Sequence, residues 1–237
     1  MNISLDNLYH SELCFLPARN EQHKLIGLEI VANFVSDDGT VRIPTELIMP
    51  RLSAGQHGQL FEEKLTLLET CQHFFIQHKL IAWIYLAPEV VDYLLTNDKY
   101  ASRINRFPFL ELMINEDFPE LSKGKENQTL KILTTKFPLI LSNFGAGDSS
   151  GRAVFDRMFK RVALDKNFIQ QRAGKPSFEP FMRAIFAQIS PCCESIMIAG
   201  IDSEEMLARV APFGFSSMQG SLWPVVPAGK ITTLAPR

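Results

Sequence analysis

Three glycines follow a short apolar run in the segment LSNFGAGDSSG, residues 141–151, and raise the question of a phosphate or metal site. A P-loop ends in Gly-Lys-Ser/Thr, and a dinucleotide fingerprint needs the spacing Gly-x-Gly-x-x-Gly. Gly145, Gly147 and Gly151 instead follow Gly-x-Gly-x-x-x-Gly, with no lysine beside them. Because glycine is the usual residue where φ must be positive, the local pattern favours a plain turn from a strand to a helix.

The soft metal ligands do not form a recognisable zinc motif. His73 and His78 lie five residues apart on an expected helix, too far round its surface to bind one metal ion together. The four cysteines, which include no Cys-x-x-Cys pair, are Cys14, Cys71, Cys192 and Cys193. We therefore expect reduced thiols. For the adjacent Cys192 and Cys193 we favour a structural or incidental role over redox sensing.

Composition limits the classes of function. The chain has 237 residues, 46% of them hydrophobic, enough for one sizeable core and typical of a single α/β barrel. A formal charge of −2 disfavours direct binding to nucleic acid. The densest basic stretch, 152–166, indicates a solvated helix face or part of a protein-binding surface. With neither a secretory signal nor a membrane span in the sequence, we expect a cytoplasmic protein.

The hydrophobic pattern predicts strands and helices in alternation. Residues 10–19 and 24–35 read as two strands joined by a polar turn, and residues 55–79 as a long amphipathic helix. Further strands are expected at 81–86, 109–114, 139–141, 162–164, 195–199 and 215–218, with helices that start at Pro88 or cover 130–136, 178–189 and 204–210. Such repeats predict a largely parallel sheet closed into a barrel, in one domain spanning residues 1–237.

In a barrel of this kind the functional residues lie at the carboxyl ends of the strands. The positions expected there are Asn33, Tyr85, Met113, Glu116, Ser142, Asn143, Ala163, Asp165, Ala199 and Gln219. Most of them are neutral or apolar, and the nearby acids are Glu29, Glu116, Asp165 and Asp202. Few hard oxygen ligands therefore remain for a divalent metal ion.

The stretches GLEIVAN, residues 27–33, and SNFGAG, residues 142–147, resemble two motifs of the EAL domain, a family best known for hydrolysing cyclic di-GMP on a modified (β/α)8 barrel. GLEIVAN, residues 27–33, is similar to Gly-Val-Glu-Ala-Leu-Leu-Arg: it keeps Glu29 but has Asn33 where an arginine helps to hold the phosphates of the ligand. SNFGAG, residues 142–147, is similar to Asp-Asp-Phe-Gly-Thr-Gly, with Ser142 and Asn143 in place of the two aspartates. The resemblance implies an EAL-type TIM-like barrel that begins with an antiparallel strand pair.

Other EAL motifs show the same losses. Relative to the family pattern, Tyr85 replaces a metal-binding asparagine, Met113 a metal-binding glutamate, Ala163 a lysine and Ala199 a glutamate. The positions that keep the family residue are Glu29, Glu116, Asp165, Phe168, Gln219 and Gly220. Since a two-metal hydrolase needs bridging carboxylates, the resemblance implies a degenerate EAL domain with no metal, no cofactor and no catalysis.

Several stretches outside these motifs resemble a degenerate, anti-flagellar branch of the family; they are 68–83, 107–117, 164–171, 177–185 and 221–227. That resemblance implies a negative regulator that binds the FlhD subunit of the FlhD–FlhC transcription activator, blocks its DNA binding and promotes its removal by a protease system. The alternatives are a cyclic di-GMP receptor, a weak cyclic di-GMP phosphodiesterase, or a barrel with another small-molecule role. The sequence does not show which surface binds the partner: the aromatic candidates Phe74, Phe75 and Phe181 have the spacing of core residues.

Overall fold

The computed structural model describes residues 1–4, 8–43, 45–146 and 151–235, without the side chains of Ser4, Glu46 and Phe168. Eight strands of these ranges close into a barrel in the order β2-β10-β9-β8-β7-β6-β5-β3 and back to β2. Their bounds are β2 (Leu8–Arg19), β3 (Leu25–Ser36), β5 (Ile81–Tyr85), β6 (Leu110–Asn115), β7 (Leu139–Phe144), β8 (Arg161–Leu164), β9 (Ser195–Ala199) and β10 (Ser217–Gln219). The predicted α/β barrel is confirmed.

One strand of the barrel runs against the others. β2 is antiparallel to both of its ring neighbours, β3 and β10, whereas the other neighbours in the ring are parallel. A tight turn joins β2 to β3, in which Asn20 Oδ1 accepts hydrogen bonds from the backbone N–H groups of Gln22 (3.0 Å) and Lys24 (2.9 Å). Because so short a connection can join only antiparallel strands, the predicted N-terminal strand pair follows from this turn.

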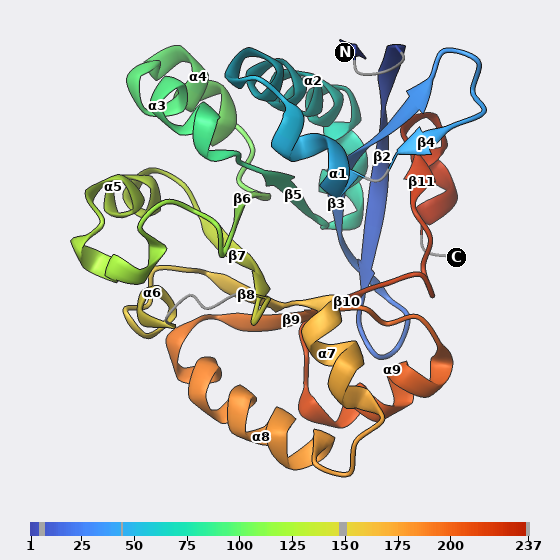
Figure 1. Cartoon of the computed structure of the whole chain (residues 1–237), viewed down its shortest axis with the longest axis vertical. Helices are drawn as coiled ribbons and strands as arrows, with labels where there is room; N and C mark the ends of the chain where they lie inside the picture. Colours follow the sequence, from blue (N-terminus) through green and yellow to red (C-terminus); the bar gives the residue numbers. More distant parts are fainter. Residues whose placement is uncertain (5–7, 44, 147–150, 236–237) are drawn as a thin grey trace.

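Helices lie outside the sheet and connect the parallel strands (Figure 1). They are α1 (Thr45–Ile48), α2 (Ala54–His78), α3 (Pro88–Thr96), α4 (Asp98–Asn105), α5 (Gln128–Lys136), α6 (Arg152–Phe155), α7 (Lys166–Ala173), α8 (Phe178–Ile189) and α9 (Glu204–Val210). The longest, α2, begins with a capping box in which Ser53 and Gln56 satisfy each other's backbone N–H groups. It ends at Lys79, whose φ of 53° is left-handed.

Strands β2 and β3 continue past the ring as a two-stranded arm, beside which β4 (Arg42–Ile43) lies (Figure 1). β1 (Asn2–Ser4) and β11 (Val226–Pro227) both pair with β2. A small second core, which includes Phe34, Ile48 and Leu60, joins the arm to α1 and the start of α2. The arm is thereby fixed to the barrel.

Side chains fill the inside of the barrel. Trp83 is fully buried there and forms one cluster with Met113, Ile140, Ala163 and Met197. Gly27 makes room for the indole, since a Cβ at this position would lie 2.5 Å from a ring carbon of Trp83. The interior is therefore a packed core, and any site must lie at one of its two ends.

Some expectations from the sequence were wrong. Asn33 is not at a strand end, because β3 continues to Ser36. The basic stretch 152–166 is not a continuous helix face: α6 ends at Phe155, Arg157 has a left-handed φ of 58°, and β8 starts at Arg161. Charge pattern alone could not separate these segments. Gly147 and the side chain of Phe168 lie outside the described part of the chain.

Candidate functional site

The strand register gathers most of the predicted positions at the carboxyl end of the barrel. Tyr85 lies opposite Met113 on β5 and β6, and Ala199 lies opposite Gln219 on β9 and β10. Glu29 (β3), Ser142 and Asn143 (β7) and Ala163 (β8) lie on other strands of the ring, and Glu116 and Asp165 directly follow β6 and β8. Asn33 is separate: it lies on the arm, where its Nδ2 donates to the Cys14 sulfur at 3.4 Å.

Glu29 joins strands from opposite ends of the chain. Its Oε2 accepts a hydrogen bond of 3.2 Å from Gln219 Nε2, so the first and last motifs of the sequence meet here. Burial raises the pKa of the Glu29 carboxyl, while the charge of Lys64 and the Gln219 hydrogen bond lower it. An ammonium group and an amide therefore act on the Glu29 carboxylate.

Tyr85 and Met113 bring an apolar surface to the carboxyl end of β5 and β6. Both belong to the cluster inside the barrel, and Met113 is buried. Burial raises the pKa of the Tyr85 phenol to about 12, with smaller contributions from the negative charges of Glu89 and Asp117. The phenol is therefore protonated at neutral pH. A protonated phenol and a thioether are poor ligands for a hard divalent cation.

The described start of the glycine loop, residues 142–146, turns away from the end of β7. Ser142 is buried, and its hydroxyl donates to the Ile114 carbonyl oxygen at 3.1 Å. Asn143 has a φ of 56°, a conformation that asparagine tolerates well, and Gly145 follows with a φ of 96°. The backbone leaves β7 through these two left-handed residues.

The remaining positions have different surroundings. Ala163 is buried inside the barrel, and Asp165 is also buried directly after β8. Asp202 is exposed, and its Oδ1 accepts hydrogen bonds from the backbone N–H and the hydroxyl of Ser221, each at 2.9 Å. Asp202 thus fixes the loop that follows β10.

The acids that remain do not gather into a metal site. Within the ranges that the structure describes, no group of three or more His, Cys, Asp or Glu side chains could hold a metal ion. Mg²⁺ and Mn²⁺ need several oxygen ligands in near-octahedral array. The described geometry at the barrel end therefore offers hydrogen bonding to Glu29 and apolar contact, and no pair of bridging carboxylates.

Sequence reasoning missed Lys64. This side chain of α2 is only 6% exposed, and burial lowers its pKa to about 8 although the charge of Glu29 favours the ammonium form. The signal was present, because Lys64 lies midway between Leu60 and Leu68 on the apolar face of the predicted helix. That spacing places a cation in the core-facing stripe, but only the structure shows that it acts on Glu29.

In the part of the chain that the structure describes, the helices are all too short or too polar to cross a lipid bilayer.

Comparison with known proteins gives consistent results. The sequence model of the EAL domain matches residues 6–224. The anti-FlhC(2)FlhD(4) factor YdiV of Salmonella typhimurium strain LT2 is 62% identical over 237 residues, which is 100% of both chains. The crystal structure of the EAL-like domain protein YdiV superposes with a TM-score of 0.88 at 54% identity, covering 99% of this chain and 100% of that one. The PaMucR phosphodiesterase in complex with c-di-GMP shares the fold, with a TM-score of 0.73 at 18% identity over 92% of this chain and 93% of the other.

Proposed function

The chain belongs to the EAL domain family, and we propose that it is a non-enzymatic member that represses flagellar genes by binding the FlhD subunit of the FlhD–FlhC activator. The observation that carries this proposal is the 62% identity, over the whole length of both chains, to a protein named as an anti-FlhC(2)FlhD(4) factor. The whole chain, residues 1–237, acts as one degenerate EAL domain in this proposal.

The geometry at the barrel end supports the absence of hydrolysis. Cleavage of a phosphodiester by two metal ions needs acids that bridge them. Ser142, Asn143 and Met113 supply none, and the retained Glu29 is hydrogen-bonded to Gln219 and influenced by Lys64. Asn33 stands where the family pattern has a phosphate-binding arginine, and its side-chain amide donates a hydrogen bond to the Cys14 sulfur. Cyclic di-GMP, a dianion, would thus meet few compensating charges from these positions.

The net charge favours inhibition by binding to FlhD over inhibition by competing for promoter DNA. With a formal charge of −2, the chain has no overall attraction to promoter DNA. In this proposal the chain binds FlhD. The bound FlhD–FlhC complex can then no longer bind promoter DNA, and FlhD–FlhC is delivered to a protease system. In this proposal the protein works in the cytoplasm, where FlhD–FlhC binds DNA. Repression then depends on the ratio of this chain to FlhD.

A titration tests the partner. The purified chain is added to FlhD–FlhC bound to a labelled flagellar promoter, and the complexes are separated by native gel electrophoresis and size-exclusion chromatography. We expect the FlhD–FlhC shift to weaken as the chain is added, a co-eluting complex with FlhD, and no shift of naked promoter. Failure to detect a complex at micromolar concentrations would overturn the proposal.

A separate assay tests the enzymatic alternative. Cyclic di-GMP is incubated with the chain and Mg²⁺ or Mn²⁺, beside an active EAL phosphodiesterase as the positive control, and the products are resolved by chromatography. We expect no linear dinucleotide and no micromolar binding by calorimetry. A product that scales with the protein and disappears with a chelator would show a phosphodiesterase, and binding without turnover would show a receptor.

A further inference from the structure

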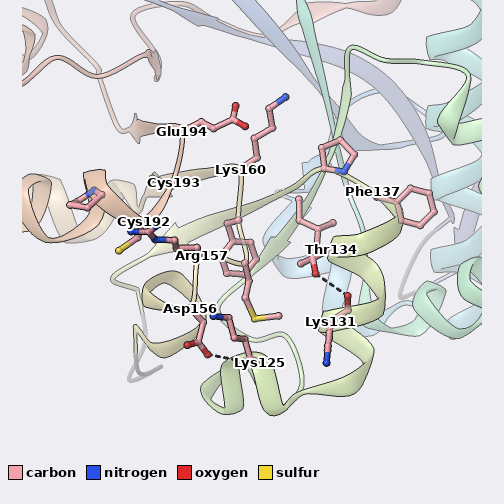
Figure 2. A pocket seen from close by; sticks show the side chains of 15 residues that line it. Lys125, Lys131, Thr134, Phe137, Asp156, Arg157, Lys160, Cys192, Cys193 and Glu194 are labelled. Atoms are coloured by element: carbon pink, nitrogen blue, oxygen red, sulfur yellow. Dashed lines mark hydrogen bonds between the residues drawn. The ribbon is translucent and has the colours of Figure 1, made fainter.

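A groove of about 660 Å³ lies at the end of the barrel opposite the candidate site (Figure 2). It is formed where the chain enters three successive parallel strands: Leu139 begins β7, Lys160 precedes β8 and Glu194 precedes β9. Its other walls come from α5 and from the segment around Lys125. None of the EAL motif positions lines it.

The groove is positively charged although the chain as a whole is negative. Lys125, Lys131, Arg157 and Lys160 line it, against the carboxylates of Asp156 and Glu194. Lys160 is paired with Glu111 at 3.0 Å, on the inner side of the groove. Among the described residues, the side chains of Lys125, Lys131 and Arg157 have no ion-pair partner within 4.0 Å. Three cations are therefore available to a ligand.

The position of Lys125 is fixed by its neighbours. The Asp156 carboxylate accepts a hydrogen bond of 2.8 Å from the Lys125 backbone N–H (Figure 2). Gly124 allows this approach: its φ is 55°, and a Cβ there would lie 2.1 Å from the same carboxylate oxygen. The loop that carries Lys125 is thus held against α6. The backbone from which the Lys125 side chain projects is therefore held at the edge of the groove.

Arg157 has an unusual backbone for its type. Its φ of 58° lies in the left-handed region, where glycine or asparagine is less strained than arginine. The charged side chain is exposed and lies beside Cys192 in Figure 2.

The floor of the groove is apolar. Phe137, Leu139, Met158 and Phe159 are buried beneath it, and exposed Pro138 adds apolar surface at one side. A ligand that matches both features carries negative charge for the rim and bulky apolar groups for the floor. A single inorganic anion could pair with the cations of the rim but would leave the apolar floor uncovered.

We propose that this groove binds an acidic peptide segment of a protein partner, one in which carboxylates alternate with aromatic or large aliphatic side chains. The carboxylates pair with Lys125, Lys131 and Arg157, and the apolar side chains cover the floor. Charge complementarity selects this class of peptide, because the rest of the chain offers acidic ligands no net attraction. The proposal goes beyond the proposed function, since it requires neither FlhD nor the candidate site.

Fluorescence anisotropy with the full chain tests the groove. The probe is a fluorescein-labelled peptide of repeated Glu-Glu-Phe triplets, and the comparison peptides are Gln-Gln-Phe and Glu-Glu-Gly repeats of equal length. We expect the first peptide to bind most tightly and its affinity to fall as salt is raised. Equal binding by the Gln-Gln-Phe repeat, or by a single-stranded oligonucleotide of equal charge, would overturn the proposal.

Matched variants locate the binding. Lys125→Gln, Lys131→Gln and Arg157→Asn should each weaken the Glu-Glu-Phe peptide about two- to fivefold, as expected for partly screened ion pairs. Asparagine suits the left-handed backbone, so Arg157→Asn should fold, and Arg157→Gly serves as a second variant. Lys230→Gln, an exposed cation outside the groove, should leave affinity unchanged. An equal loss in Lys230→Gln, or no loss in the groove variants, would contradict the assignment.

A cysteine thiol in the groove allows binding to be detected by chemical modification. Cys192 lines it and is partly exposed, whereas Cys14 is buried elsewhere. Bound Glu-Glu-Phe peptide should slow alkylation of Cys192 by iodoacetamide, measured by peptide mass spectrometry. Alkylation of the partly exposed Cys71, which does not line the groove, is the internal control. Unchanged alkylation of Cys192 under saturating peptide would place the binding elsewhere.

Discussion

Replacement of Glu111 by alanine should be one of the most destabilising single changes in this barrel. The Glu111 side chain is buried near the start of β6. Its Oε2 accepts from Trp83 Nε1 at 2.9 Å and from Arg161 Nε at 2.8 Å, and its Oε1 lies 3.0 Å from Lys160 Nζ. One carboxylate therefore holds strands β5, β6 and β8 together at the end of the barrel opposite the candidate site.

The cost follows from the groups that lose their partner. The Trp83 indole N–H is fully buried, and an unpaired buried donor costs about 1–3 kcal/mol. The Arg161 side chain is only 15% exposed, and among the described residues it would keep its hydrogen bond to the Ser195 hydroxyl. Removing one partner of a buried ion pair costs about 3–5 kcal/mol, because the other charge stays buried. We expect Glu111→Ala to lose about 3–5 kcal/mol, a large part of the roughly 5–15 kcal/mol typical of a domain.

Glu111→Gln separates the hydrogen bonds from the charge. Its amide oxygen can still accept from Trp83, so the loss should be about 1–3 kcal/mol and smaller than that of alanine. Lys160→Met is the matched control for the outer ion pair: the Lys160 side chain is 33% exposed, and we expect a cost of at most about 1 kcal/mol. The free energy of unfolding is measured by urea titration with far-UV circular dichroism after reversibility is established.

The order of the three variants decides the argument. A loss below about 1 kcal/mol for Glu111→Ala would mean that water or a shifted side chain replaces the carboxylate, and the account of this network would be wrong. The same conclusion follows if Lys160→Met costs as much as Glu111→Ala.

Three further changes test the candidate site and the domain. Burial lowers the pKa of Lys64 from 10.5 to about 8, so between these pH values the unfolded chain binds a proton that the native state has released. The free energy of unfolding of the unmodified chain, relative to that of Lys64→Met, should therefore rise from about pH 8 to 10.5. Urea titrations that give the same pH dependence for both proteins would contradict this. Ser142→Asp with Asn143→Asp should give no cyclic di-GMP hydrolysis and a less stable protein, because a carboxylate would face the Ile114 carbonyl oxygen to which Ser142 donates; metal-dependent turnover by this variant would refute the reading. If residues 1–237 form one domain, fluorescence and circular dichroism should report the same unfolding transition, and two separate midpoints would argue for two units.

Local patterns predicted the elements better than their ends. The amphipathic period of residues 55–79 predicted α2, which the structure places at Ala54–His78. The polar turn after residue 19 predicted the antiparallel pair of β2 and β3. In contrast, the charges at 152–166 indicate a helix face or part of a protein-binding surface, and the helix face is wrong because a left-handed turn at Arg157 and β8 interrupt it. Charged residues fit a helix surface, a turn or a strand end equally well, so the spacing of the charges could not tell these three structures apart.

The sequence by itself determined which side chains occupy the motif positions. Ser142, Asn143 and Met113 are not acids whatever the fold, because side-chain identity needs no coordinates. Only the tertiary structure decided what these positions contact: that Gln219 donates to Glu29 and that Lys64 is buried where its charge acts on Glu29. The groove at the opposite end likewise unites segments that no sequence motif connects. The reason is that helix and strand periods record local geometry, whereas barrel closure brings together residues far apart in the chain.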